Sequence, residues 1–418
     1  MSARLAVIGA GPIGLEAALA ASDAGFDVQV YESGSVGAQL ARFGDVPLFT
    51  PFGMNSTEAT RERLRRAGVS LPSEQAILGA RAFVHGYLEP IARLPELRGR
   101  VRERTRVIGI AREGLVKPEA IASAGDRRRA GRPFVIRSEH PEGTSFEAAD
   151  VVVDASGVVS RPLATGPGGL AARGESGLGD QVDRHLLPTE EEVRARYAGR
   201  RVLLVGSGHS AATALLAFEA LARGRSRPAR VVWVHRDRGE GGPFPELAED
   251  PLPARAALVQ EANRIAADGS PWLERRPEAA VLAYEPGPAW GLRVRLRSRE
   301  GLVESVGVDR VYALVGYRPD TDLFRELQVH LCYASEAPMA LASALLASRM
   351  ADPTRAGDCL AQTTHGAETL RTTEPGFFVL GAKSYGRNPD FLMRVGYEQA
   401  RELMGLLAAG FSVPVAAG

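Results

Sequence analysis

The chain has 418 residues, more than one typical domain of about 100–200 residues, so we expect two or three domains. Its 51 basic and 50 acidic side chains leave a formal net charge of +1, and no apolar stretch approaches the roughly 18–20 residues of a membrane span, so neither nucleic acid nor a membrane is an expected partner. Two cysteines exclude a disulfide scaffold and a cysteine-rich zinc site, so we expect no metal centre and a cytoplasmic location.

The first predicted element is a short buried strand at residues 4–8, followed by Gly9-Ala-Gly11-Pro-Ile-Gly14 and an Ala/Leu-rich helix. In this pattern the first glycine makes a tight turn, the second lets a pyrophosphate approach, and the third lets helix and strand pack closely. The helix N-terminus offers amide donors to the phosphates. Glu32, at the end of the next strand, is placed to accept hydrogen bonds from ribose hydroxyls. The segment therefore predicts nucleotide binding.

The next part of the chain alternates between helical and strand patterns. Helices are predicted around 57–68 and 73–94, and β-type segments at 101–113 and 132–139. Three consecutive arginines at 127–129 fall between those two β segments. A charge run at such a place predicts a solvated hairpin tip rather than a binding patch.

The order strand, glycine turn, helix, strand then recurs. A second buried strand at 201–205 leads into Gly206-Ser-Gly208-His-Ser-Ala211, an apolar helix follows, and another strand spans 231–236. Ala211 takes the third glycine position. The repeat predicts a second dinucleotide-binding domain.

The end of the second strand of this repeat differs from the first. When the two repeats are aligned, Arg236 faces Glu32, and His235 and Arg238 flank it. A carboxylate would repel a 2′-phosphate, whereas guanidinium groups bind one bidentately, so these residues favour NADPH over NADH. The alternative is an exposed basic turn without a ligand. His209, inside the second turn, is open to two roles, contact with NADPH and helix capping.

Several segments resemble the flavoprotein oxidoreductases with paired dinucleotide domains, which include thioredoxin reductases, bacillithiol disulfide reductase-like proteins and flavin-containing monooxygenases. The resemblance is carried by Val-Val-Val-Asp-Ala-Ser-Gly157, by the segment 309–319 with Gly-Tyr-Arg-Pro, by Pro-Gly-Phe-Phe-Val-Leu-Gly381, and by His235-Arg236-x-Arg238. It implies that the first domain holds FAD, with Gly157 and Gly381 near the cofactor, and that an inserted domain holds NADPH.

The resulting fold prediction is an α/β protein with two Rossmann-like three-layer dinucleotide-binding domains, the NADPH domain being inserted into the FAD domain. We expect residues 1–165 to form the first part of the FAD domain, 166–304 the NADPH domain and 305–418 the second part of the FAD domain.

The sequence also departs from the family pattern. The second repeat lacks the Cys-x-x-Cys of thioredoxin reductases, and Ala382-Lys383 follows Gly381 where most members have an aspartate that binds the ribityl chain. The run Gly386-Arg387-Asn388 resembles the bacillithiol disulfide reductase-like branch, which also lacks the dithiol.

Catalytic residues are not determined by these motifs, and three candidates carry alternatives. Cys359 is the better placed of the two thiols, although a bystander thiol is the plainer interpretation. His365 is either an acid or base or a structural histidine. Lys383 either stabilises reduced flavin or is solvated. Met54 and Asn55 are candidates for lining the flavin pocket.

We interpret the chain as an NADPH-dependent FAD oxidoreductase, and we favour a monooxygenase that acts on a small molecule with oxygen. Two alternatives remain open: a reductase of a disulfide, quinone or redox protein that lacks the Cys-x-x-Cys relay, and a non-catalytic protein that binds flavin and NADPH. A homodimer is the expected assembly.

Overall fold

The computed structural model describes residues 2–187, 189–224, 227–236, 242–247, 249–287, 291–351, 360 and 362–410. The chain divides into two compact units. The first unit comprises Met1–Ala41, Thr50–Arg161 and Arg318–Gly418, and the second comprises Arg42–Phe49 and Pro162–Tyr317.

The first unit contains a parallel sheet with strand order β16-β7-β1-β2-β3 and an antiparallel sheet with order β4-β5-β6. Its strands are β1 (Arg4–Ile8), β2 (Asp27–Tyr31), β3 (Val101–Arg102), β4 (Arg106–Arg112), β5 (Phe134–His140), β6 (Gly143–Ala149), β7 (Val151–Asp154) and β16 (Phe377–Val379). Its helices are α1 (Pro12–Asp23), α2 (Ala38–Ala41), α3 (Glu58–Arg66), the continuous segment α4 (Ala80–Phe83), η1 (Val84–Leu88) and α5 (Glu89–Ala92), then α9 (Met339–Ala351) and α10 (Met393–Gly410).

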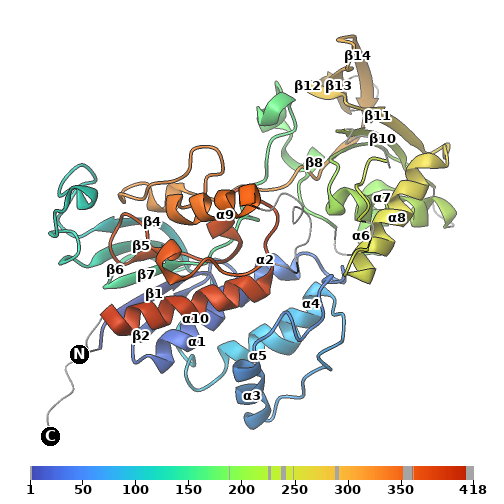
Figure 1. Ribbon diagram of the computed structural model, residues 1–418. Helices are drawn as coiled ribbons and strands as arrows, with labels where there is room; N and C mark the ends of the chain where they lie inside the picture. The colour runs from blue at the N-terminus through green and yellow to red at the C-terminus, as the bar shows by residue number, and fades with distance from the viewer. Residues whose placement is uncertain are drawn as a thin grey trace, which may run out of the picture. The chain divides into compact units, whose positions relative to one another are not determined.

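The parallel sheet of the first unit is the middle of three layers. Helices α1 and α10 pack against each other (Figure 1), and Val7 of β1 lies beneath α1 at Gly14. Ala6 and Ile8 point to the other face, where they join a buried cluster with Phe134 and other residues of the antiparallel sheet. This alternation buries β1 on both faces, which explains why its sequence is a continuous apolar run.

The second unit repeats this plan. Its parallel sheet has the order β11-β10-β9-β15-β8, and its antiparallel sheet has the order β12-β13-β14. The elements are β8 (Val182–Asp183), α6 (Glu190–Tyr197), β9 (Arg201–Val205), α7 (His209–Arg223), β10 (Arg230–His235), α8 (Pro253–Ala267), β11 (Leu273–Pro277), β12 (Ala280–Gly287), β13 (Gly291–Arg297), β14 (Val303–Val308) and β15 (Arg310–Ala313).

Two buried clusters cover the two faces of this parallel sheet. Leu204 and Trp233 face residues of α6, α7 and α8, whereas Leu203 and Val232 face the antiparallel strands. Each unit therefore has helices, a parallel sheet and an antiparallel sheet as successive layers. The predicted α/β class with two Rossmann-like three-layer domains is confirmed.

The bounds of the second unit differ from the expected 166–304. It runs on to Tyr317, because β14 pairs with β13 and β15 pairs with β9 and β8. It also takes in Arg42–Phe49. Phe43 and Val46 pack against its helical core cluster.

The arginine run at 127–129 is only partly solvated, so the expectation of a solvated tip is wrong for its last member. Arg129 is fully buried and pairs with the buried Glu374 at 2.9 Å, as does Arg112 at 2.7 Å. A charge run is usually exposed because buried guanidinium groups need compensation. Here the carboxylate that supplies it comes from a segment 245 residues away.

Candidate functional site

The first glycine turn joins β1 to α1 with very little space. Gly9 has φ +100°, and its N–H donates to the Tyr31 carbonyl at 2.7 Å. A Cβ placed on Gly14 would lie 1.9 Å from the carbonyl oxygen of Gly9. Both positions therefore require glycine for the fold itself.

Gly11 differs from its two neighbours in the motif. It is the N-cap of α1 with φ −82° and ψ −174°, a conformation open to any residue, and a Cβ placed on it would meet no atom within 4 Å. No side chain caps the helix there. The turn thus leaves open space in front of the N–H groups of a helix N-terminus, which is the arrangement that suits a phosphate.

Glu32 lies beside this space and is 7% exposed. One carboxylate oxygen accepts the N–H of Ala10 at 2.8 Å, and the other accepts the N–H of Gly34 at 2.8 Å and the Ser33 hydroxyl at 3.2 Å. These bonds fix the carboxylate against the glycine turn. Two carboxylate oxygens offer about four acceptor positions, so one remains for a ribose hydroxyl.

Lys383 forms a buried ion pair with Asp154, so the interpretation of a solvated lysine is wrong. Its ammonium group donates to Asp154 Oδ2 at 2.6 Å and to the Ser156 hydroxyl at 3.0 Å, and both ion-pair side chains are at most 1% exposed. It also lies 5.4 Å from the centroid of the Phe324 ring. Asp154 Oδ1 accepts the backbone N–H and the hydroxyl of Ser156. This pair ties the segment after β16 to the end of β7.

The turn that follows Asp154 contains Gly157, which has φ +71° and open space where a Cβ would be. Gly381, after β16, has φ +72° and lies against Ile13 at the start of α1. The ends of β1, β7 and β16 therefore bring Gly11, Gly157 and Gly381 to the same edge of the parallel sheet, where ligands of such sheets bind.

The second glycine turn repeats the geometry of the first. Gly206 has φ +145°, and a Cβ on it would lie 2.3 Å from the Leu314 carbonyl oxygen. Gly208 is the N-cap of α7, which no side chain caps, and a Cβ on it would meet no atom within 4 Å. Ala211 is fully buried inside the first turns of α7. His209, the first residue of this helix, is exposed and packs edge-on against Phe49 at 5.4 Å.

The strand register places His235, not Arg236, at the position equivalent to Glu32. Gly9 donates to the Tyr31 carbonyl, and Gly206 donates to the Val234 carbonyl at 3.1 Å, so the next residues, Glu32 and His235, correspond. The expected alignment was therefore one residue too far along. His235 is 2% exposed, and its ring lies tilted against that of Trp233, with the ring centroids 4.1 Å apart.

His235 is buried, so Arg236 is the first residue after β10 whose side chain is exposed to solvent. Arg238 lies outside the described residues, and its predicted role stays a prediction.

Searches with the amino-acid sequence give no matching family model and no matching curated protein. Solved structures match over nearly the whole chain. Bacillithiol disulfide reductase from Bacillus cereus aligns over 98% of this chain and 100% of its own, with 16% identity and a TM-score of 0.68. Ornithine N-hydroxylase from Kutzneria sp. 744, solved with reduced FAD, NADP+ and L-ornithine, aligns over 98% and 100% with 15% identity and a TM-score of 0.63. Thioredoxin reductase from T. acidophilum aligns over 97% of both chains with 15% identity and a TM-score of 0.56.

The chain has the fold of the paired-domain flavoprotein oxidoreductases. The predicted resemblance is confirmed at the level of the fold. In this fold, each glycine turn joins the first strand of its repeat to the N-terminus of the helix that follows.

The remaining candidates are less well supported as parts of one site. Cys359 lies outside the described residues. His365 is half-buried and burial lowers its pKa, while the nearby Glu402 opposes this shift in part. A neutral imidazole at this position fits a structural role as well as a base. No described group of three or more His, Cys, Asp or Glu side chains could hold a metal ion.

Asn55, a candidate for lining the flavin pocket, is buried and forms several hydrogen bonds within the protein. These bonds give it a structural role that needs no ligand. Its side chain bonds both the hydroxyl and the carbonyl of Thr50, and its own carbonyl accepts the Tyr397 hydroxyl at 2.6 Å. Met54 is partly exposed next to it. Burial raises the pKa of Tyr397 well above its usual value, so its hydroxyl stays protonated and remains a donor.

Asp154 and Ser156 are the residues that sequence reasoning missed. In the sequence they are only part of a strand-and-turn pattern, whereas in the structure both accept hydrogen bonds from the Lys383 ammonium group. The available signal was the rarity of lysine, since the chain has only Lys117 and Lys383. Finally, no helix in the described part of the chain is long and apolar enough to span a membrane.

Proposed function

We propose that this protein is an FAD-dependent oxidoreductase that takes its electrons from NADPH. The observation that carries the proposal is the repeated glycine turn, with open space at Gly11 and at Gly208 in front of uncapped helix N-termini. Two such turns in one chain fit two dinucleotides. When bound, the flavin would accept a hydride from NADPH and pass the electrons to an acceptor.

The first unit is the proposed FAD site. The N–H groups at the start of α1 would bind the pyrophosphate, and Glu32, already oriented by Ala10 and Gly34, would bind the ribose. Gly157, where a Cβ would meet open space, would allow the backbone to approach the cofactor closely, and Gly381 would lie beside the cofactor with its Cα packed against Ile13. The buried Lys383–Asp154 ion pair would hold the ends of β7 and β16 together at this edge of the sheet.

The second unit is the proposed NADPH site. The N–H groups at the start of α7 would bind the pyrophosphate, and Arg236 with Arg238 would bind the 2′-phosphate. His235 is buried, so it would shape the end of β10 and would not extend into solvent toward the ligand. At the position that Glu32 occupies in the first unit, this strand has His235 and not a carboxylate, which supports NADPH over NADH.

For the acceptor we favour oxygen, in a monooxygenase that acts on a small molecule. The two cysteines stand 27 positions apart, so the chain offers no Cys-x-x-Cys relay to a disulfide substrate. The ornithine N-hydroxylase structure shares the fold over 98% of this chain. The second candidate is a reductase of a low-molecular-weight disulfide or quinone, supported by the similarity to bacillithiol disulfide reductase.

Anaerobic reduction followed by acceptor challenge tests the proposal. The purified protein should be yellow, and NADPH should bleach it stoichiometrically without oxygen, whereas NADH should act much more slowly. Failure of NADPH to reduce bound flavin would reject the oxidoreductase. Turnover that needs oxygen supports the monooxygenase, and turnover that continues anaerobically with a disulfide or quinone supports the reductase.

The cysteines give a second test of the acceptor. A Cys332→Ser/Cys359→Ser variant of a monooxygenase should keep both flavin reduction and oxygen consumption, because neither step needs a thiol. A loss of about a hundredfold in turnover, equivalent to about 2.7 kcal/mol of barrier, with flavin content unchanged, would favour a thiol-dependent reductase.

A further inference from the structure

The outer face of the antiparallel sheet in the second unit carries a row of arginines. In the central strand β13, Leu292, Val294 and Leu296 are at most 5% exposed and point into the core. The residues between and after them, Arg293, Arg295 and Arg297, point to the other face. We call these three side chains the β13 arginine row.

The row has no carboxylate partner among the described residues. Most other arginines near it are paired: Arg299 with Glu278 at 2.8 Å, Arg276 with Glu304 at 2.8 Å, and Arg173 with Glu285. Glu285, the carboxylate opposite Arg293 in the register, is thus already paired with Arg173. No ion pair is formed by Arg293, Arg295 or Arg297 with any described residue, and the undescribed turn residues 288–290 carry no charge.

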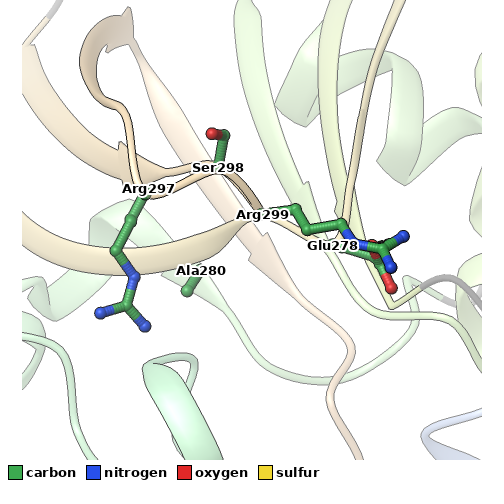
Figure 2. Close-up of a pocket in the computed structure, with 6 residues that line it drawn as sticks. Glu278, Ala280, Arg297, Ser298 and Arg299 are labelled. Carbon is green, nitrogen blue, oxygen red and sulfur yellow. Dashed lines mark ion pairs between the residues drawn. The ribbon is translucent and has the colours of Figure 1, made fainter.

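A shallow cavity lies at one end of the row. It has a volume of about 470 Å³ and is lined by Arg297, Ser298, Arg299, Glu278 and Ala280, together with Gly301. Figure 2 shows the Arg297 guanidinium pointing away from the Arg299–Glu278 pair, so that its donors are not used there. A carboxylate that entered this cavity would meet an uncompensated guanidinium.

We propose that the β13 arginine row is a docking surface for an acidic protein segment in extended conformation. Alternate residues of a strand repeat at the same spacing on both chains, so carboxylates at every second position of the partner would each face one arginine. Like charges along one strand face repel one another, and an acidic partner removes that repulsion. The positive charge of the β13 arginine row therefore favours a negatively charged partner segment.

The neighbouring residues favour a protein over a nucleic acid. Val303, which is opposite Arg297 in the register, is 48% exposed, and Leu302 beside it is 72% exposed. Exposed apolar side chains next to arginines are typical of protein interfaces.

The test uses a synthetic probe, a fluorescent peptide in which glutamate alternates with threonine, and measures its binding to the full chain by anisotropy. The row variant is Arg293→Gln/Arg295→Gln/Arg297→Gln. The control variant, Arg98→Gln/Arg194→Gln/Arg200→Gln, removes the same charge at three exposed arginines that form no ion pair with described residues. Thermal unfolding and flavin content confirm that both variants are folded.

We expect the row variant to weaken binding by about tenfold or more and the control by less than about twofold, with the wild-type affinity falling steeply as salt is added. A peptide with glutamine in place of glutamate should not bind. No binding by the wild type, or equal losses in both variants, would overturn the proposal. So would tighter binding of an oligothymidylate through the same arginines. Binding needs no turnover, so this result is independent of the proposed function.

Discussion

At the residue scale, Gly11 and Gly14 allow ligand binding to be separated from folding. Gly11→Val adds a side chain where the protein leaves open space, so the variant should fold normally and yet be colourless, because the valine occupies the proposed pyrophosphate position. Flavin content per chain and the melting temperature of the flavin-free protein measure the two effects.

Gly14→Val is the matched comparison, because its Cβ would lie 1.9 Å from the Gly9 carbonyl. It should lower the melting temperature of the flavin-free protein as well as the flavin content. Stoichiometric flavin in folded Gly11→Val would remove the proposed FAD site from this turn.

Lys383 gives a prediction about stability. Lys383→Met leaves the buried Asp154 without its counter-charge and should destabilise the first unit by about 3–5 kcal/mol. Adding Asp154→Asn should recover part of that loss, since the asparagine oxygen can still accept from Ser156. Arg4→Met, at the exposed Arg4–Asp150 pair, should cost about 1 kcal/mol or less.

Denaturant unfolding of the three variants measures these differences. If Asp154→Asn/Lys383→Met were as unstable as Lys383→Met alone, the lysine would stabilise the protein by packing and not by its charge.

Single side chains were the least predictable part of the molecule. The motif glycines could be predicted because each answers a local backbone requirement. Arg129 and Lys383 could not, because their carboxylate partners are more than 200 residues away in sequence. Burial of a charge is decided by such distant partners, and no local pattern reports them.

At the scale of the elements, the end of β10 carries the choice between the two nicotinamide cofactors. Arg236→Gln should weaken NADPH binding by about 10- to 100-fold, because it removes a charge-assisted contact worth about 1.5–3 kcal/mol. Binding of NADH should barely change. Arg200→Gln, at another exposed arginine of the second unit, is the control.

Titration of the anaerobic protein with each nucleotide gives the dissociation constants. If Arg236→Gln weakens NADH as much as NADPH, the arginine supports the local structure and does not read the 2′-phosphate.

The strand–turn–helix units were predictable because their apolar runs and glycine spacing are local in sequence. Strand register was not: the sequences of β2 and β10 can be aligned in two ways one residue apart, and the bond from Gly206 to Val234 decides between them. A slip of one residue moves a side chain to the opposite face. That slip separates the buried His235 from the exposed Arg236.

At the scale of the whole molecule, each unit has its own hydrophobic clusters, and each should respond to its own cofactor. A ligand that binds only the folded state stabilises the unit that holds it. FAD should therefore slow hydrogen exchange mainly in β1 and β7, and NADP+ mainly in β9 and β10.

Mass spectrometry of peptides from each unit measures this exchange, with Gly11→Val as the control that loses only the first effect. If FAD protected the second unit of Gly11→Val from exchange, the flavin would bind at the second glycine turn, which would contradict the proposed FAD site.

The path of the chain between the units also has a consequence during synthesis. The second unit is encoded almost entirely by one continuous stretch, and its outlying part, Arg42–Phe49, is made earlier. The first unit cannot complete its parallel sheet until β16 pairs with β7, across more than 200 intervening residues. On the ribosome, the second unit can therefore fold while β7 still exposes an unpaired edge. A nascent chain that stalls before Phe377 would present this open edge to chaperones or to other chains.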